Sequence, residues 1–192
     1  MILSKIPLSF FQTKNVQEIA QNLLGKIIYT NINGQITSAM ITETEAYQGP
    51  EDRASHAYNN KRTVRTEAMY KLGGCCYIYL CYGIHYLFNI VTNVHNIPHT
   101  VLIRSGKIHT GIEHVQERRG IHIQASKLLQ GPGNFAKGLG INMNLNGVDV
   151  NTNHIWIINN EIQNPTIIKT QRVGIDYAEA DALLPWRYIL KD

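Results

Sequence analysis

Apolar residues recur every three or four positions across residues 13–24, which is the period of an amphipathic α-helix. Thr13 precedes the first apolar position and Gly25 follows the last, and both residue types are common at helix ends. The next two apolar stretches, 26–32 and 35–47, flank the dipeptide Asn33-Gly34, which favours a type I′ hairpin turn. The pattern therefore predicts one helix followed by a β-hairpin.

Short strands and short helices alternate through the rest of the chain. The tyrosine-rich run at 75–82 and the apolar run at 84–92 meet at Gly83, which predicts a second hairpin. The other expected elements are a short helix at 63–72, a strand at 100–104, a helix at 134–139 entered from Gly131-Pro132-Gly133, and strands at 154–158 and 166–173. Hairpins without helical crossovers predict an α+β fold with a mostly antiparallel sheet. A length of 192 residues suits a single domain spanning 1–192.

Composition narrows the class of protein only a little. With 44% hydrophobic and 17% charged residues, the chain is typical of folded globular proteins. The N-terminal residues lack the long apolar run of a signal peptide, and no stretch is long enough to cross a membrane. We therefore expect a cytoplasmic protein, and the compact chain suggests a bacterial one. A net charge of +4 permits a nucleic-acid partner without requiring one.

Three cysteines, Cys75, Cys76 and Cys81, lie within seven positions of one apolar strand. Adjacent cysteines rarely form a disulfide, and no Cys-x-x-Cys spacing occurs, so we expect buried, reduced thiols. A metal or redox site is the alternative interpretation. The eight histidines show no metal-ligand spacing either, and we expect neither a metal nor another cofactor.

Two groups of basic residues could contact phosphate or could simply be solvated. Lys61, Arg62 and Arg65 lie between His56 and the tyrosine-rich strand, and their position leaves both interpretations open. Arg118 and Arg119 lie farther along the chain, and we expect them to be solvated surface charges.

The strand at 35–47 ends with the residues that best indicate chemistry. Side chains alternate across a strand, so Glu43, Glu45 and Tyr47 are expected on one face, with His56 shortly after the Gly-Pro turn. A glutamate on a strand is most often a surface residue. Beside an aromatic ring and a histidine, however, a carboxylate could act as a general base on a water molecule. The spacing does not choose between Glu43 and Glu45.

The second hairpin carries aromatic residues that suit a planar ligand. Tyr77 and Tyr79 share one face of their strand, which indicates either packing or stacking on a ligand. Tyr82 is at the tip of the hairpin, where an exposed ring could act as a wedge between stacked bases. Asn89 and Arg104 are polar residues within apolar strands, and each needs a partner if it is buried. The sequence therefore leaves two roles open for Asn89 and Arg104, a structural hydrogen bond or recognition of a substrate.

Taken together, the motifs resemble the alkyladenine (3-methyladenine) DNA glycosylase family over most of the chain, from about Ile6 to Leu190. The matching segments are Glu43-Thr44-Glu45-Ala46-Tyr47, Gly49-Pro50-Glu51-Asp52, Ala54, His56, Tyr77, Tyr79, Tyr82-Gly83, Asn89, Val101-Leu102-Ile103-Arg104, Gly131-Pro132-Gly133, Lys137, 173–178 and Pro185-Trp186-Arg187. The chain differs from the family pattern at His85, beside the hairpin turn, and at the pair Cys75-Cys76.

The resemblance implies the fold and the roles of individual residues. The implied fold is one mixed domain around a curved, mostly antiparallel sheet flanked by helices, with a protruding hairpin that enters DNA. Glu45 would be the base that activates water, and His56 and Arg104 would help to hold the water and the nucleotide phosphate. The residues implied to bind the flipped base are Tyr47, His56, Tyr79, Asn89 and Leu102. Of these, Asn89 would exclude guanine. Those implied to contact DNA are Tyr82, which fills the gap in the duplex, Gly83, Thr63, Arg65, Met69 and Lys137.

The activity implied by the resemblance is the excision of damaged purines from double-stranded DNA. The enzyme would flip 3-methyladenine, 7-methylguanine, hypoxanthine or ethenoadenine out of the helix and hydrolyse the N-glycosidic bond. No lysine is placed as an obvious Schiff-base nucleophile, so a monofunctional enzyme without strand cleavage is expected. We expect a monomer at the nucleoid that needs no membrane and no obligate protein partner.

Two other classes of function also fit parts of the sequence. Glu43 and Glu45 lie about 6.5–7 Å apart along a strand, a spacing that an inverting carbohydrate hydrolase could use. The chain has only two tryptophans, however, and neither lies near the pair in the sequence. The same aromatic face could also belong to a non-catalytic protein that binds damaged DNA.

Overall fold

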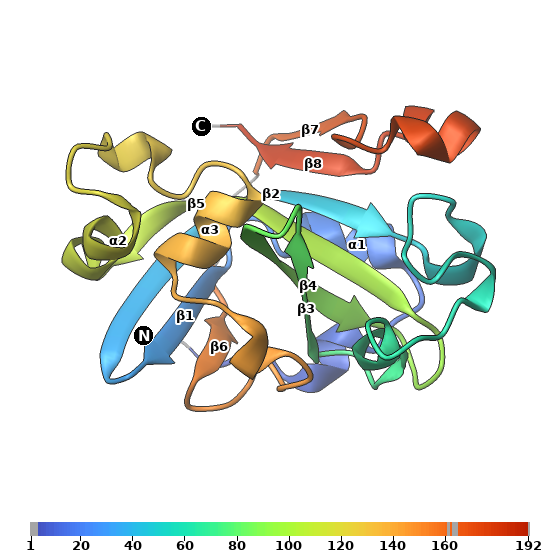
Figure 1. The fold of residues 1–192 in the computed structure, drawn as a ribbon, viewed down its shortest axis with the longest axis horizontal. Coiled ribbons are helices and arrows are strands. Elements are labelled where there is room, and N and C mark those ends of the chain that lie inside the picture. Colours follow the sequence, from blue (N-terminus) through green and yellow to red (C-terminus); the bar gives the residue numbers. More distant parts are fainter. Residues whose placement is uncertain (1–3, 161, 163–164, 192) are drawn as a thin grey trace.

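An eight-stranded sheet in which every pairing is antiparallel organises the part of the chain that the structure describes (Figure 1). This computed structural model describes residues 4–160, 162 and 165–191. The strand order is β3-β4-β5-β2-β1-β6, and β8 pairs with both β2 and β7. The strands are β1 (Ile27–Ile32), β2 (Gln35–Tyr47), β3 (Cys76–Cys81), β4 (His85–Thr92), β5 (His99–Thr110), β6 (Ile155–Ile158), β7 (Ile167–Thr170) and β8 (Arg187–Leu190). The predicted α+β class with a curved antiparallel sheet is confirmed.

In the part of the chain that the structure describes, three short α-helices pack on this sheet: α1 (Val16–Asn22), α2 (Ile112–Arg119) and α3 (Pro132–Gly138). The expected N-cap at Thr13 is wrong, because the Asn15 side chain accepts a hydrogen bond from the Glu18 N–H (3.0 Å) and begins α1 two residues later. None of the helices within the described residues is long and apolar enough to cross a membrane. Residues 1–3 of the expected N-terminal segment lie outside the described part of the chain.

The helix expected at 63–72 is also wrong, since this segment contains only a 3₁₀ turn, Glu67–Tyr70. The Thr66 hydroxyl bonds to the Lys61 carbonyl (3.1 Å) and to the Thr63 N–H (2.8 Å). Such local bonds between a threonine side chain and the backbone compete with helix formation. The segment therefore remains a compact loop.

The elements that were not predicted from the sequence include α2, β8 and the 3₁₀ segment Asp176–Leu183. In α2 only Val115 is buried, so the helix has almost no apolar face to detect. Strand β8 is four residues long, too short for a clear alternation. The strand expected at 100–104 continues to Thr110, and this extension pairs with β2.

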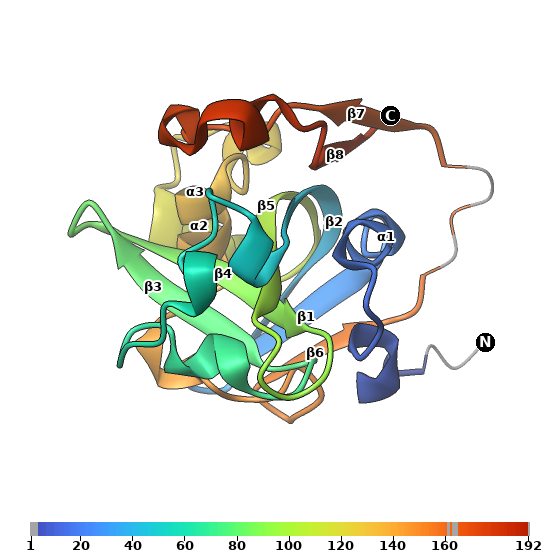
Figure 2. The same ribbon diagram turned by 90° about the vertical axis from the view of Figure 1, so that its right-hand side faces the viewer.

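Both predicted hairpin turns have the backbone geometry of type I′. Asn33 and Gly34 have φ angles of 54° and 82°, and Tyr82 and Gly83 have φ angles of 51° and 73°. The β3–β4 hairpin projects from the body of the protein, on the side away from α1 (Figure 2). At its tip, the Tyr82 side chain is 91% exposed. The protruding hairpin inferred from the sequence is therefore present.

Strand β2 separates the core from the candidate chemistry. Thr44 and Ala46 are buried on the side of α1, and the Thr44 hydroxyl donates to the Ala20 carbonyl (2.8 Å). The alternate residues Glu43, Glu45 and Tyr47 project from the opposite face, as the strand period predicted. The sheet therefore buries one row of β2 in the core and presents the other to the site.

Arg118 and Arg119 are not solvated charges, contrary to expectation. Arg118 donates to the Gly138 carbonyl (3.0 Å) and to Gln35 Oε1 (2.8 Å), and Arg119 donates to the Leu128 carbonyl (3.0 Å). Both side chains therefore fix loops around α2 and α3. Both residues are partly buried and keep these structural contacts.

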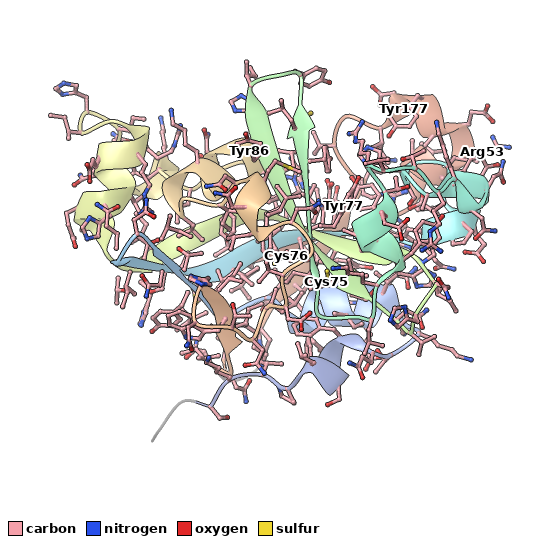
Figure 3. The ribbon with its side chains drawn as sticks, turned by 60° about the horizontal axis from the view of Figure 1, so that its bottom comes forward. Arg53, Cys75, Cys76, Tyr77, Tyr86 and Tyr177 are labelled. Atoms are coloured by element: carbon pink, nitrogen blue, oxygen red, sulfur yellow. The ribbon has the colours of Figure 1, made fainter. Side chains whose placement is uncertain are left out.

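The cysteines are free thiols, as expected, but only two of the three are buried. Cys75 and Cys76 lie in the core at the start of β3, where Figure 3 shows them at the base of the hairpin. Burial raises the pKa of Cys75 to about 11, so this thiol is protonated and unreactive at neutral pH. Cys81 is half-buried near the hairpin tip, so the expectation of burial is wrong at that position.

Candidate active site

One row of paired residues brings distant parts of the chain together across five strands. Tyr77 on β3 pairs with Asn89 on β4, which pairs with Leu102 on β5, then Glu45 on β2 and Arg187 on β8. Residues directly opposite one another in a sheet point to the same face. The register therefore places these side chains, more than 100 positions apart at the extremes, on one surface.

A cavity of about 650 Å³ opens on this surface, between the hairpin and the loops that follow β2 and β7. Six of the residues that were predicted to form the site line it: Tyr47, His56, Tyr79, Asn89, Leu102 and Arg104. Arg65, Met69 and the hairpin-tip residue Tyr82 also line it. This volume suits a planar ligand the size of a nucleobase with its sugar.

The Glu45 carboxylate lies under the wall of the cavity, with 0% of the residue exposed. Its Oε1 accepts the Val173 N–H (2.9 Å) and faces Arg104 Nη1 at 3.3 Å, and its Oε2 accepts the Tyr47 hydroxyl (2.8 Å). Val173, Arg104 and Tyr47 all line the cavity. The carboxylate is therefore enclosed by the groups that face a ligand, and it is directed at them rather than at solvent.

Burial raises the pKa of Glu45, while the Arg104 charge and the hydrogen bonds from Val173 and Tyr47 oppose that increase. The net direction is upward from 4.5. A carboxyl group with a raised pKa is a stronger base once it is ionised. These features distinguish Glu45 from an ordinary surface glutamate.

Glu43 is held differently, by three neighbouring side chains. It accepts hydrogen bonds from Arg104 Nε (2.9 Å), Arg187 Nε (2.6 Å) and the Ser105 hydroxyl (2.8 Å). Burial raises its pKa, but the Ser105 bond and the two arginines outweigh burial, so the pKa lies below 4.5. Glu43 is therefore an ionised anchor for Arg104, which reaches both carboxylates.

An irregularity in the β2–β5 pairing explains how Arg104 reaches its position. Glu43 pairs with Ser105 and Thr44 pairs with Ile103, so Arg104 is an extra residue on β5. Such a β-bulge rotates the following side chains out of regular alternation. As a result, Arg104 and its neighbour Ser105 both contact Glu43, which regular alternation would not allow.

Three aromatic rings form the other wall of the cavity. The His56 ring lies edge-on to Tyr79 (centroids 4.6 Å apart), and its Nδ1 is 2.8 Å from the Tyr77 hydroxyl. Burial, with the charges of Arg65 and Lys61, lowers the pKa of His56 to about 4, so the ring is neutral at pH 7. The Arg65 guanidinium stacks on Tyr79, 4.9 Å from its centroid. The wall is therefore aromatic with a cation at its edge.

Asn89 is buried in this wall, and its amide donates to the Tyr77 carbonyl (3.1 Å). Because the same residue lines the cavity, one hydrogen bond fixes the amide beside the space that a ligand would occupy. The sequence left open whether Asn89 is structural or reads a substrate. Its geometry is compatible with both roles.

The residues expected to contact DNA are distributed unevenly. Met69 is only 1% exposed and lies beneath the cavity, while Thr63, Gly83 and Lys137 are outside the cavity lining. Of the basic cluster, Arg62 is held by Glu67 (2.9 Å) and lies over the Tyr70 ring, so it is not a free charge.

Several residues of the site were missed from the sequence. Ser105 and Arg187 anchor Glu43, the Val173 N–H binds Glu45, and Arg172 lies behind Tyr47. Val173 and Arg187 stand in segments that match the family pattern, but no contact was assigned to them. Ser105 and Arg172 lie outside those segments, and all four reach the site through tertiary contacts. Within the described residues, no group of three or more His, Cys, Asp or Glu side chains could hold a metal ion.

Comparison with known proteins agrees with this geometry. The family model described as methylpurine-DNA glycosylase (MPG) matches residues 9–192. The chain belongs to the methylpurine-DNA glycosylase family. It is 44% identical to a protein of Chlamydia felis over 96% of this chain and 95% of the other, and 40% identical to one of Natranaerobius thermophilus over 98% and 96%. A protein of Borrelia garinii is 38% identical over 95% of each chain. All three carry the name "Putative 3-methyladenine DNA glycosylase".

Membership in this family establishes the class of enzyme. The protein is a DNA glycosylase, a hydrolase of DNA repair that acts on a DNA substrate. The enclosed glutamate and the aromatic cavity are therefore the candidate active site of a glycosylase. The resemblance inferred from the sequence motifs is confirmed.

Proposed function

We propose that the protein removes alkylated purines from duplex DNA by hydrolysing the N-glycosidic bond, with Glu45 as the base that activates water. The observation that carries this proposal is the enclosed Glu45 carboxylate beside a cavity walled by Tyr47, His56 and Tyr79. A target base inside a helix is inaccessible, so it must leave the stack to enter such a cavity. Stacking on aromatic rings returns about 1–3 kcal/mol per base.

The exposed hairpin tip supports the extrusion step. Tyr82 lines the cavity and projects from the protein, so it can enter the duplex as the target base enters the cavity. The backbone of the type I′ turn holds the ring in this position. Arg65 lines the cavity, and in this proposal it would contact the phosphate of the displaced nucleotide.

The chemical step needs a water molecule at the sugar carbon and a base to deprotonate it. Glu45 Oε2 accepts one hydrogen bond, from Tyr47, and so keeps capacity for a second from water. A small displacement of the Tyr47 ring as the flipped base stacks on it admits this water, since catalytic contacts often form only in the complex. Arg104 supports the ionised carboxylate from the other side.

An alkylated purine already carries positive charge, so it leaves without a protonating group. Hypoxanthine and ethenoadenine are neutral and would need a proton donor; we include them as candidate substrates. None of the described lysines lines the cavity, which supports a monofunctional enzyme that leaves the strand intact. Residues 1–192 would act as one glycosylase domain, as a monomer without an obligate protein partner, on the DNA of the bacterial cytoplasm.

A carbohydrate hydrolase is less compatible with the site. An inverting enzyme needs one carboxyl group with a raised pKa as its acid and a second carboxylate as its base. The raised pKa of Glu45 would suit the acid. Glu43, however, is badly placed as the base, because its oxygens accept three hydrogen bonds and it is outside the cavity lining. Trp186 is distant from Glu45 in the sequence but near it in the fold, because the Ala46 N–H donates to the Trp186 carbonyl. The Trp186 side chain is still outside the cavity lining.

The decisive experiment measures release of free base from duplexes that carry 3-methyladenine, 7-methylguanine, hypoxanthine or ethenoadenine. The wild-type protein should release at least one of the alkylated bases. Glu45→Gln should keep its affinity for the same duplex and lose roughly 10²-fold or more in rate, which is the contribution of a general base. A non-catalytic binder would release nothing in either form. Equal rates for the wild-type protein and the Glu45→Gln variant would refute the role of Glu45.

A further inference from the structure

Arg172 is a fully buried arginine directly behind the cavity wall. Its side chain and that of Asp52 are both 0% exposed and form a bidentate ion pair, with Nη1–Oδ2 at 2.5 Å and Nη2–Oδ1 at 2.9 Å. The guanidinium lies between two rings, 4.7 Å from the Tyr47 centroid and 5.1 Å from the Trp186 centroid. Buried charges are costly unless they are paired, so this arrangement needs an explanation.

The contacts of Arg172 converge on both oxygens of Glu45. The Tyr47 hydroxyl, whose ring stacks on Arg172, donates to Oε2, and the N–H of the next residue, Val173, donates to Oε1. Arg172 also donates to the carbonyl of Ala46, the residue between Glu45 and Tyr47 (2.9 Å). Of the groups that hold the carboxylate, the Tyr47 ring therefore stacks on the Arg172 guanidinium, and the Val173 N–H directly follows Arg172 in the chain.

Asp52 connects the same guanidinium to the loop that carries His56. Its carboxylate accepts the N–H groups of Gln48 (3.2 Å) and Ala54 (3.0 Å) as well as the arginine. Arg172 also donates to the Asp181 carbonyl (3.1 Å), in the 3₁₀ segment that packs on Ala54. The pair therefore joins β2, the following loop and the C-terminal segment at one buried point.

We propose that Arg172 is a positioning residue for Glu45, and that Asp52 neutralises it so that the Tyr47 ring can stack on a positively charged base. The inference rests on the proposed excision of alkylated purines. A base stacked on the cavity side of Tyr47 would have the guanidinium on the other face of the same ring. With Asp52 present, the group behind the ring is a neutral pair.

Removing only the charge of Asp52 would place an uncompensated cation behind the ring. The cation and a methylated purine would lie on opposite faces of Tyr47, roughly 8 Å apart if the base stacks at van der Waals distance. Repulsion at that distance in a buried site corresponds to about 10- to 30-fold in affinity. A neutral lesion such as ethenoadenine would not experience this repulsion. Lesion charge therefore separates an electrostatic role from a purely structural one.

The test compares Asp52→Asn with Glu179→Gln. Each variant loses one negative charge and the acidic partner of one arginine, Arg172 for Asp52 and Arg53 for Glu179. Both arginines connect the loop after β2 to the 3₁₀ segment Asp176–Leu183. The Arg53–Glu179 pair, however, is exposed and does not touch Tyr47. Affinity is measured for duplexes with 7-methylguanine and with ethenoadenine, in a Glu45→Gln background so that no base is released during titration.

Asp52→Asn should weaken binding of the 7-methylguanine duplex about 10-fold more than binding of the ethenoadenine duplex, whereas Glu179→Gln should affect both equally. An equal effect of Asp52→Asn on both duplexes would overturn the electrostatic part of the proposal. A wild-type protein that prefers neither damaged duplex over undamaged DNA would instead overturn the proposed function. The two failures are therefore distinguishable.

A second variant keeps the test valid if Asp52→Asn does not fold. Replacing both charges, Asp52→Asn with Arg172→Met, leaves no buried unpaired charge, and such replacements are often neutral for stability. This double variant should recover the wild-type ratio of affinities for the two duplexes. With Glu45 intact, its single-turnover rate at saturating protein should remain at least about 10-fold below wild type, because the supports of Glu45 are lost. A wild-type rate in a folded double variant would overturn the positioning role.

Discussion

Replacing Glu43 with Gln should lower the pKa of Glu45 and move the acid limb of base release to lower pH. In the proposed mechanism Glu45 works as a carboxylate, so activity would be lost as the pH falls through its pKa. Burial raises that pKa above 4.5, and the Glu43 charge adds to the increase. Removing the charge of Glu43 while keeping its shape removes this contribution, and activity should then persist at a more acidic pH.

The size of the shift follows from the spacing on β2. The Cα atoms of residues two apart on a strand lie about 6.5 Å from each other, and we take this as the separation of the two charges. Two like charges at this distance interact by about 2.5 kcal/mol at an effective dielectric constant of 20, which equals about 2 pH units. Arg104, which now binds Glu43 through Nε, would be free to approach Glu45 and act in the same direction. The Glu43 charge is the weakest of the five influences on the pKa of Glu45, so this figure is an upper limit and we expect a smaller downward shift.

The assay is single-turnover base release between pH 4 and 8, with spontaneous release from the same duplex subtracted. Glu113→Gln is the matched control, because it removes one exposed negative charge on α2, far from the cavity. Its pH profile should match the wild type. A lower rate for Glu43→Gln at every pH, with the acid limb unmoved, would show that Glu43 only holds Arg104 in place. An acid limb at higher pH would refute the electrostatic reasoning.

Three further substitutions test other parts of the molecule. Tyr82→Ala removes a ring that is 91% exposed, so the free energy of unfolding should change by less than about 0.5 kcal/mol. The rate of excision should fall most for well-stacked lesions. Wild-type rates on those duplexes would exclude a wedge role for Tyr82. Asn89→Ser should relax discrimination against guanine, measured as guanine release from undamaged duplex, and no release would remove that assignment. Phe135→Ala, on the core face of α3, should lower the free energy of unfolding in urea by about 3–5 kcal/mol. A smaller loss would mean that neighbouring side chains fill the space left by the ring.

Local sequence signals predicted the parts of the fold that depend on local chemistry. Asn33-Gly34 and Tyr82-Gly83 are turns because their residues adopt positive φ, and the alternation along β2 placed Glu43, Glu45 and Tyr47 on one face. The helix expected at 63–72 was wrong because Thr66 bonds to the backbone, a competition that apolar periodicity does not report. Helix α2 was missed because only Val115 is buried.

The site residues that belong to a sequence motif were predicted, whereas those that reach the site through strand pairing or a loop were not. The resemblance assigned roles to Glu45, Tyr47 and Arg104, and all three contribute to one arrangement of contacts. Arg187 reaches Glu43 only because β8 pairs with β2, and Arg172 reaches Tyr47 only through the long loop after β7. Such pairings depend on tertiary structure, which neither composition nor spacing encodes.

The pairing of β8 with β2 also has a consequence for biosynthesis. One edge of β2 is covered by β1 only as far as Met40, and Glu43 to Glu45 on that edge are covered by β8. Arg187 is translated 144 residues after Glu43, so a ribosome-bound chain presents this edge unpaired for most of its elongation. An uncovered edge recruits other strands. We therefore expect the nascent chain to be prone to aggregation until β8 emerges, and a product terminated before that point to stay in this condition.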